Sequence, residues 1–450
     1  MSMQHLRQLL LTGQRTSLSL TMEAIAKANL YREKNALATI SPQALTLAQA
    51  RDHDIKQGKI RGPLHGIPIV IKDNVFYQDG TPTTCNSYAL KDFFPSHHAS
   101  IVDALMQAGA VILGKANLSE FAYFMGDETM PSGYGSMYGQ VKHPFDETID
   151  PYGSSTGSAV AVSLGIVPAS IGSETNGSLM APAYQCQIIS FKPSFGMVSR
   201  HGIIPLSGQQ DIAGPMATNV YDCALLMDAL SFVDQQDETT LHIPRPTDWT
   251  EALEKPMRHA RVAIVSFVDQ VYDAYDKVVL EKTKARLKKL GHTVVELTIP
   301  LPRLENYPTL LVEFKYAINQ FFNQYHTEGT PPSLEALIAF NQNHKERCLR
   351  YGQAILEASN KTSGDIDDPN YRSMRQQLLL EAKVFDDLMS VHNLDAIVTP
   401  RWLGFAPIFG NPSVCIPEGV FDHQPKATVW VGRLYDDRTL LSLTHHYQSR

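Results

Sequence analysis

Apolar and polar positions follow two alternating periods along the chain. Short apolar runs recur between segments with helical spacing, and Gly- and Pro-rich turns separate them. Because strands and helices alternate, we expect an α/β fold in which one large sheet is covered by helices on both faces. The apolar runs predict strands at 36–40, 67–71, 110–114, 167–172, 188–191, 261–267, 293–297, 394–400, 413–417 and 427–432.

The same pattern divides the chain into five expected segments. A polar, proline-bearing stretch at 231–255 indicates a linker, and the spacing from 304 to about 388 is mostly helical. The expected segments are an N-terminal helical part (1–60), a core (61–230), a linker, strand and helix that continue the sheet (231–303), a mainly helical insertion (304–390), and C-terminal strands with a closing helix (391–450).

Composition and charge exclude several kinds of partner. The 450 residues carry a formal net charge of -7 and no strongly basic run, so we expect neither nucleic acid nor an anionic membrane as a partner. The stretch 152–173 has no formal charge, but half of it is Gly, Ser and Thr and Pro168 divides it. We interpret it as a buried helix and strand, and the N-terminal apolar segment is too short for a signal peptide.

Cysteine and histidine positions predict no metal site. There is no H-E-x-x-H, P-loop or dinucleotide fingerprint, so we expect no metal and no cofactor. The doublets His97–His98 and His445–His446 point their side chains apart on a regular element and are interpreted as surface residues. Unpaired cysteine spacing favours a reducing cytoplasm. The five cysteines are Cys85, Cys186, Cys223, Cys348 and Cys415.

One candidate nucleophile is Ser155. The sequence GSSTG, residues 153–157, matches the G-x-S-x-G elbow of α/β-hydrolases, and His445 or His446 would suit the triad order. That elbow needs a buried strand immediately before the serine. The preceding residues are polar and contain two prolines, which argues against it.

A second hypothesis uses two serines and a lysine. Ser178 lies on the Gly-rich bend GSETNGSLMAPA, Ser154 lies in another Gly-Ser loop, and Lys72 ends an apolar strand. A lysine can remove a serine proton only when it is neutral, and burial lowers its pKa. Lys115 and Lys192 also lie near apolar runs, and each can equally be a solvated or backbone-bonding lysine.

Five segments in a fixed order resemble the amidase signature family. They are HGIPIVIKDNV, GAVILGKANLSEF, GSSTGSAVAV, GSETNGSLMAPA and FKPSFGMVSRHGIIPLSGQQDIAGPMA, and the resemblance is strong from about Gly62 to Leu230. It implies a large mixed, twisted central β-sheet covered by helices on both faces, with an inserted mainly helical region. It also implies a serine amidohydrolase in which residues 61–230 form the signature core.

The resemblance assigns the catalytic roles. The family's catalytic lysine falls on Lys72, its bridging serine on Ser154 and its nucleophile on Ser178, with a cis peptide bond before Ser154. Neutral Lys72 would accept a proton from Ser154, which takes one from Ser178 as Ser178 attacks the amide carbonyl. An acyl-enzyme intermediate would follow.

Other residues are expected to support this triad. Gly153 and Ser155 would shape the loop that holds Ser154, and Asp211 would tie backbone together. Gln209 and Gln210 are possible wall residues. The expected oxyanion hole consists of the backbone N–H groups of Thr175, Asn176, Gly177 and Ser178.

Departures from the family pattern bear on the substrate. The usual bend has a second glycine where this chain has Asn176, and an arginine where it has Met180. The sequences of the motifs are most similar to those of the peptide amidase branch, whose members remove a C-terminal amide from peptides. Residues 120–145 and the helical region 304–390 are expected to supply the pocket walls.

We therefore expect hydrolysis of a carboxamide, either a peptide amide or a small aryl or alkyl amide, by a cytoplasmic monomer or homodimer. One alternative is an amidotransferase A-type subunit that releases ammonia from glutamine within a multi-subunit complex. The other is a non-catalytic scaffold of the same fold. All three reactive side chains are present, which argues against the scaffold.

Overall fold

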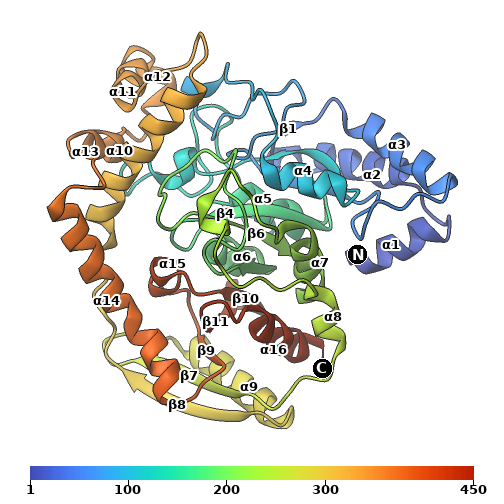
Figure 1. The fold of residues 1–450 in the computed structure, drawn as a ribbon, viewed down its shortest axis with the longest axis vertical. Helices are drawn as coiled ribbons and strands as arrows, with labels where there is room; N and C mark the ends of the chain where they lie inside the picture. The colour runs from blue at the N-terminus through green and yellow to red at the C-terminus, as the bar shows by residue number, and fades with distance from the viewer. Residues whose placement is uncertain (450) are drawn as a thin grey trace.

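An eleven-stranded mixed sheet runs through the centre of the molecule (Figure 1). The computed structural model describes residues 1–449. The strand order is β1-β3-β2-β4-β6-β5-β10-β11-β9-β7-β8. The strands are β1 (Leu37–Ile40), β2 (Pro68–Lys72), β3 (Val111–Ala116), β4 (Ala169–Glu174), β5 (Ile189–Lys192), β6 (Ile212–Ala217), β7 (Arg261–Phe267), β8 (Thr293–Ile299), β9 (Ala396–Thr399), β10 (Ser413–Phe421) and β11 (Gln424–Gly432).

Helices surround this sheet and extend from one side of it as an arm, coloured orange in Figure 1. They are α1 (Met3–Leu11), α2 (Ser17–Leu30), α3 (Ala44–Lys56), α4 (Ser100–Gln107), α5 (Thr156–Ser163), α6 (Met180–Cys186), α7 (Val220–Leu230), α8 (Trp249–Glu254), α9 (Ala274–Lys289), α10 (Asn306–Tyr325), α11 (Leu334–Asn343), α12 (Lys345–Cys348), α13 (Ala354–Asn360), α14 (Pro369–Val391), α15 (Phe405–Phe409) and α16 (Asp437–Ser449). Four 3₁₀ turns are η1 (Arg32–Lys34), η2 (Tyr88–Leu90), η3 (Glu120–Tyr123) and η4 (Glu238–Thr240).

Both faces of the sheet are buried. Side chains alternate between the faces of a strand, and in β2 Ile69 and Ile71 join one hydrophobic cluster while Val70 joins the other. A strand that is covered on both faces must be apolar throughout, which is why β2 reads as a continuous apolar run. The predicted α/β arrangement of helices around one sheet is confirmed.

The direction of the central strands positions the candidate chemistry. β2 pairs in parallel with β3 on one side and with β4 on the other. The carboxyl ends of parallel strands lie at the same edge of a sheet. Lys72, the last residue of β2, therefore comes to the edge where β4 ends at Glu174 and the chain turns into the bend before α6.

All ten predicted strands are present, but the sequence pattern missed β6. Its residues, IAGPMA, include Gly, Ala and Pro, which are poor strand formers. It pairs antiparallel with both β4 and β5, and this tertiary pairing overrides its weak propensity. The uncharged stretch 152–173 forms α5 and most of β4, as predicted. Within residues 1–449, no helix combines the length and apolarity needed to cross a bilayer.

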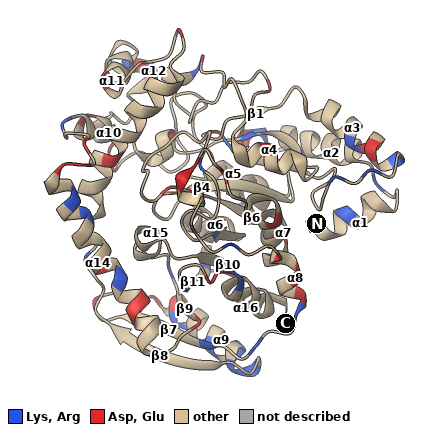
Figure 2. Cartoon of the chain, in the orientation of Figure 1, with Lys and Arg blue, Asp and Glu red and all other residues tan. Residues whose placement is uncertain are grey.

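The inserted helical region forms an arm beside the sheet. α10 packs against α13 and α14, and α14 also contacts α15. Figure 2 shows acidic and basic residues interspersed along α14, so this helix does not present a face of one sign of charge.

We predict that Gly157→Ala lowers the free energy of unfolding by about 1–3 kcal/mol, because overpacking forces backbone shifts. A Cβ on Gly157 would lie 2.2 Å from the carbonyl oxygen of Ala36 and 2.5 Å from that of Asn117. Urea denaturation at neutral pH measures the change. Gly208→Ala is the matched control, since a Cβ there meets no atom within 4 Å. Equal stability of the two variants would contradict this account of the α5 packing.

Candidate active site

The side chain of Lys72 is enclosed by hydroxyl and carbonyl oxygens. It is 0% exposed. Its Nζ lies 2.8 Å from Ser154 Oγ, 3.0 Å from Ser155 Oγ, 3.0 Å from Ser173 Oγ and 3.1 Å from the Ser173 carbonyl oxygen. Burial lowers the pKa of Lys72 to about 7, because the charged form loses its hydration. The neutral and charged forms of the amine are therefore both well populated at about pH 7.

The hydrogen bonds of Ser155 restrict what it can do. Its hydroxyl donates to the Ser173 carbonyl over 2.9 Å and accepts from the Ser173 N–H over 3.1 Å. A hydroxyl has one proton, so Ser155 can only accept a hydrogen bond from Lys72. This arrangement ties the loop to β4 and leaves the Ser154 hydroxyl free to donate to a neutral amine.

Ser173 belongs to this group, although the sequence reasoning missed it. Its hydroxyl accepts hydrogen bonds from Lys72 and from Asn74 Nδ2, the latter over 3.1 Å. A signal was available: Ser173 is the penultimate residue of the strand that lies next to the lysine strand. Using that signal required the pairing of β2 with β4, which the sequence pattern alone does not specify.

Two loops meet at the site. The peptide bond between Gly153 and Ser154 is cis, as the resemblance implies. A Cβ on Gly153 would lie 2.5 Å from Ser119 Oγ, so a side chain there would have to displace the Ser119 hydroxyl. The Ser155 N–H donates to the Ser178 carbonyl over 3.3 Å and joins this loop to the bend. Ser178 is 9% exposed, at the border between the interior and solvent.

The bend itself is built around Gly177. Its φ is +86°, in the left-handed region that favours glycine, and a Cβ would lie 2.9 Å from two atoms of the Trp402 ring. Within the described chain, the N–H groups of Asn176, Gly177 and Ser178 donate to no protein acceptor. Backbone donors without a protein partner are available to an acceptor in a ligand.

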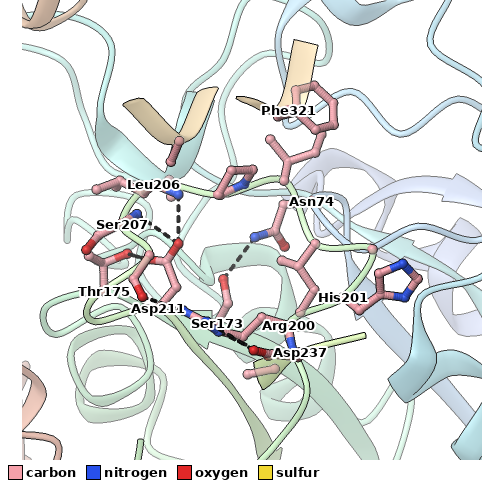
Figure 3. Close-up of a pocket in the computed structure, with 18 of the residues that line it drawn as sticks. Asn74, Ser173, Thr175, Arg200, His201, Leu206, Ser207, Asp211, Asp237 and Phe321 are labelled. Carbon is pink, nitrogen blue, oxygen red and sulfur yellow. Dashed lines mark hydrogen bonds and ion pairs between the residues drawn. The ribbon is translucent and has the colours of Figure 1, made fainter. Parts of the chain in front are cut away.

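Asp211 holds the residue that begins this bend. Its Oδ1 accepts from the Thr175 hydroxyl over 2.5 Å, and its Oδ2 accepts from the N–H groups of Leu206 and Ser207 (Figure 3). Gln210 Nε2 donates to the Thr175 carbonyl over 3.1 Å. Asp211 is half-buried and Gln210 is buried, and the contacts of both residues join two segments of backbone.

A cavity of about 310 Å³ lies beside the bend. Its lining includes Asn74, Ser173, Thr175 and Phe321 of α10 (Figure 3). Its walls also include Ala122, and they are largely apolar at residues 203–206. The cavity thus draws on both regions, 120–145 and 304–390, that were expected to supply pocket walls.

The two departures from the family bend occupy different environments. Met180 is 2% exposed and belongs to a hydrophobic cluster, so it faces the protein interior. The side chain of Asn176 is close to Gly404, where a Cβ would lie 3.3 Å from its Nδ2. Glu174 Oε2 accepts from the N–H groups of Leu179 and Met180, which fixes the start of α6.

The alternative bases and the elbow hypothesis find no support in the geometry. Lys115 Nζ donates to the Pro82 carbonyl, and Lys192 Nζ donates to the Asn411 carbonyl, so both are buried lysines that bond to backbone. No strand precedes Ser155, whose hydroxyl bonds to Ser173 and Lys72. Among residues 1–449, no group of three or more His, Cys, Asp or Glu side chains could hold a metal ion.

Comparison with known proteins identifies the family. Residues 19–430 match the family described as Amidase. The chain belongs to the amidase family. It is 31% identical to the A-type subunit of the glutamyl-tRNA(Gln) amidotransferase of Chloroflexus aggregans, in an alignment that covers 98% of this chain and 94% of the relative.

Two solved structures extend the comparison for this amidase. The native peptide amidase from Stenotrophomonas maltophilia is 33% identical with a TM-score of 0.93, and the match covers 100% of this chain and 96% of that chain. The A-type subunit of the glutamyl-tRNA(Gln) amidotransferase of Thermotoga maritima has a TM-score of 0.70 over 95% of this chain and 90% of its own, and at 23% identity it shows the shared fold alone.

The amidase is thus an enzyme that hydrolyses amide C–N bonds. The family resemblance drawn from the five motifs is confirmed, including its similarity to the peptide amidase branch.

Removing the buried amine of this amidase changes the pH dependence of stability. The pKa of Lys72 is lowered from 10.5 to about 7 in the folded state. Between these values the unfolded chain binds a proton that the folded chain does not, so folding stability rises with pH. Relative to Lys72→Met, we predict that the wild-type free energy of unfolding increases by about 1.4 kcal/mol per pH unit from about pH 7.5 to about pH 9.5.

Urea denaturation across this pH range measures the difference. Lys56→Met is the control, because Lys56 is exposed on α3, and its difference from wild type is expected to stay constant. A constant difference for Lys72→Met as well would show that the lysine is ordinarily hydrated.

Proposed function

We propose that this amidase is a serine amidohydrolase in which Ser178 is the nucleophile, Ser154 the bridging residue and Lys72 the base. The observation that carries the proposal is a buried lysine amine 2.8 Å from the Ser154 hydroxyl. Lysine is an effective base near neutral pH only when its pKa is lowered, and burial achieves this here.

The proton path runs through Ser154, because the Ser155 hydroxyl already donates its proton to the Ser173 carbonyl. Neutral Lys72 accepts the Ser154 proton, and Ser154 accepts the proton of Ser178 as Ser178 Oγ bonds to the amide carbonyl carbon. The proton then returns along the same path to the leaving nitrogen, and the C–N bond breaks to release ammonia or an amine. Water attacks the resulting ester by the same relay, which frees the carboxylate and restores Ser178.

The bend supplies the stabilisation of negative charge. We assign the oxyanion hole to backbone N–H groups of residues 175–178. Three of these residues, Asn176, Gly177 and Ser178, have N–H groups with no acceptor within the described protein. Fixed donors at such a position stabilise the tetrahedral intermediate, and removing one from other enzymes slows kcat about 100- to 1,000-fold. Thr175 begins the bend and is held by Asp211.

The substrate class we propose is a peptide amide. The similarity to a peptide amidase extends over the whole chain, including the helical arm. The cavity beside the bend has apolar walls from residues 203–206 and α10, which suit the side chains of an acyl group. Its polar side, at Ser173 and Asn74, lies next to the reacting residues.

An amidotransferase A-type role is the second candidate, because the sequence is also similar to such a protein over nearly its full length. Two substrates separate the roles. A peptide amidase hydrolyses a peptide carboxamide as an isolated chain, whereas the amidotransferase component releases ammonia from glutamine and depends on partner chains. Assaying the purified chain with both substrates distinguishes them.

We predict that a fluorophosphonate labels Ser178 of the native enzyme. Ser178→Ala is expected to lose the label and to reduce kcat for a peptide amide by at least about 1,000-fold, because covalent catalysis cannot proceed without the nucleophile. Peptide mass spectrometry locates the adduct. Ser136→Ala is a control at a buried serine whose hydroxyl bonds to Glu120, and it should keep both the label and the activity. An adduct on Ser154 or Ser155 would refute the assignment.

The pH profile tests the base. Since the pKa of Lys72 is lowered to about 7, kcat/KM should rise through about pH 7 and level off above it. At about pH 5 it should be about 100-fold below the plateau, because only the neutral amine accepts a proton. Lys72→Ala should be inactive at every pH. Initial rates from about pH 5 to about pH 9.5 provide the profile, and a flat profile would rule out lysine as the base.

A further inference from the structure

We propose that Gln210 and Arg375 are positioning residues that orient the oxyanion hole from the helical arm. The inference rests on the proposed function and adds to it a link between α14 and the bend. Gln210 lies on the chain just before β6, and Arg375 lies on α14, 165 residues later in the sequence. Neither is expected to contact the reacting atoms.

Gln210 connects the two elements directly. Its side chain is 1% exposed. Its Nε2 donates to the Thr175 carbonyl over 3.1 Å, and its Oε1 accepts from Arg375 NH1 over 2.8 Å. The amide nitrogen is therefore bonded to the bend, and the amide oxygen is bonded to the helical arm.

Arg375 determines which way this amide faces. A guanidinium group only donates hydrogen bonds, so the atom of Gln210 that faces it must be the amide oxygen. The amide nitrogen is then directed to the Thr175 carbonyl, and the reversed orientation would place donors against donors. Without Arg375, only the hydrogen bond to the Thr175 carbonyl would hold the Gln210 amide in this orientation.

The Thr175 carbonyl in turn orients a catalytic donor. The carbonyl of Thr175 and the N–H of Asn176 belong to one planar trans peptide group, so they point in opposite directions. Fixing the carbonyl toward Gln210 aims the Asn176 N–H away from Gln210. The Asn176 N–H has no acceptor within the described chain, which agrees with a donor that is held for the substrate.

Arg375 is itself held in place. Its NH2 donates to the carbonyls of Ile408 and Gln209 over 3.3 and 3.4 Å. One turn earlier on α14, the Tyr371 hydroxyl donates to Glu313 of α10 over 2.7 Å, and the same buried carboxylate accepts from the Ser207 hydroxyl. Both helices therefore contact the loop that contains Gln210.

The decisive variant is Gln210→Glu. A glutamate keeps a partner for Arg375 but has no N–H to donate to the Thr175 carbonyl, so the fold is supported while the bend loses its orientation. We expect kcat for a peptide amide to fall about 10- to 100-fold with KM within about threefold, since donors misplaced by a fraction of an ångström lose much of their effect. Gln376→Glu adds the same charge at an exposed position of α14 and should leave kcat unchanged.

A second pair of variants tests the arginine. Arg375→Met should lower kcat about tenfold, and Arg375→Lys, which can still donate to Gln210 Oε1, should recover most of that loss. Arg372→Met is the matched control on the same helix, where the arginine pairs with Asp367 at the exposed surface. Active-site titration with a fluorophosphonate gives the concentration of folded enzyme, so that kcat is compared per competent site.

The outcomes separate this inference from the proposed function. Wild-type kcat in both Gln210→Glu and Arg375→Met would overturn the positioning role, as would equal losses in Gln376→Glu or Arg372→Met. A rise in KM with unchanged kcat would make these residues substrate contacts and would also overturn it. Activity that survives in Ser178→Ala would instead refute the proposed nucleophile, whatever the other variants do.

Discussion

The burial of one lysine amine is the constraint on which the rest of the site depends. Lys72 ends a strand that is covered on both faces, so its side chain cannot reach water. An ammonium group in such a place loses its hydration, and the surrounding serine oxygens compensate only in part. The result is an amine whose pKa is lowered to about 7, so that a large fraction of it is neutral near physiological pH. The cost of desolvation, which would destabilise a structural lysine, keeps part of the amine unprotonated near neutral pH and so able to accept a proton.

The site is also a problem of backbone packing. The loop that carries Ser154 must approach the lysine, the bend that carries Ser178 must approach that loop, and glycine eases both approaches. Gly153 lies against Ser119, and Gly177 lies against Trp402 with φ positive, so a side chain at either position would have to displace a neighbour. The N–H groups that are left without protein partners at residues 176–178 are a consequence of that bend. Geometry that would be costly in an ordinary turn is stabilised here by the contacts of Glu174 and Asp211.

The sequence predicts the parts of this structure that depend on local pattern. Continuous apolar runs located ten of the strands, and the ordered motifs located the two loops and the lysine. What it could not predict depends on tertiary pairing. β6 is weak as an isolated strand and exists because β4 and β5 flank it. Ser173 joins the site because its strand lies beside the strand of Lys72, and Arg375 reaches Gln210 across 165 residues of chain. The hydrophobic periodicity of a single sequence predicts neither of these long-range contacts.

Contacts between the helical arm and the bend connect substrate binding with the chemical step. The helical arm walls the cavity through α10, and through α14 it contacts the loop that holds the bend. A shift of the arm that admits a different acyl group would therefore also move the Gln210 amide and, with it, the peptide plane that carries the Asn176 N–H. The proposed coupling means that changes of specificity in the arm are constrained by catalysis as well as by the fit of the substrate. The pairs Gln210–Arg375 and Ser207–Glu313 are the contacts through which that constraint acts.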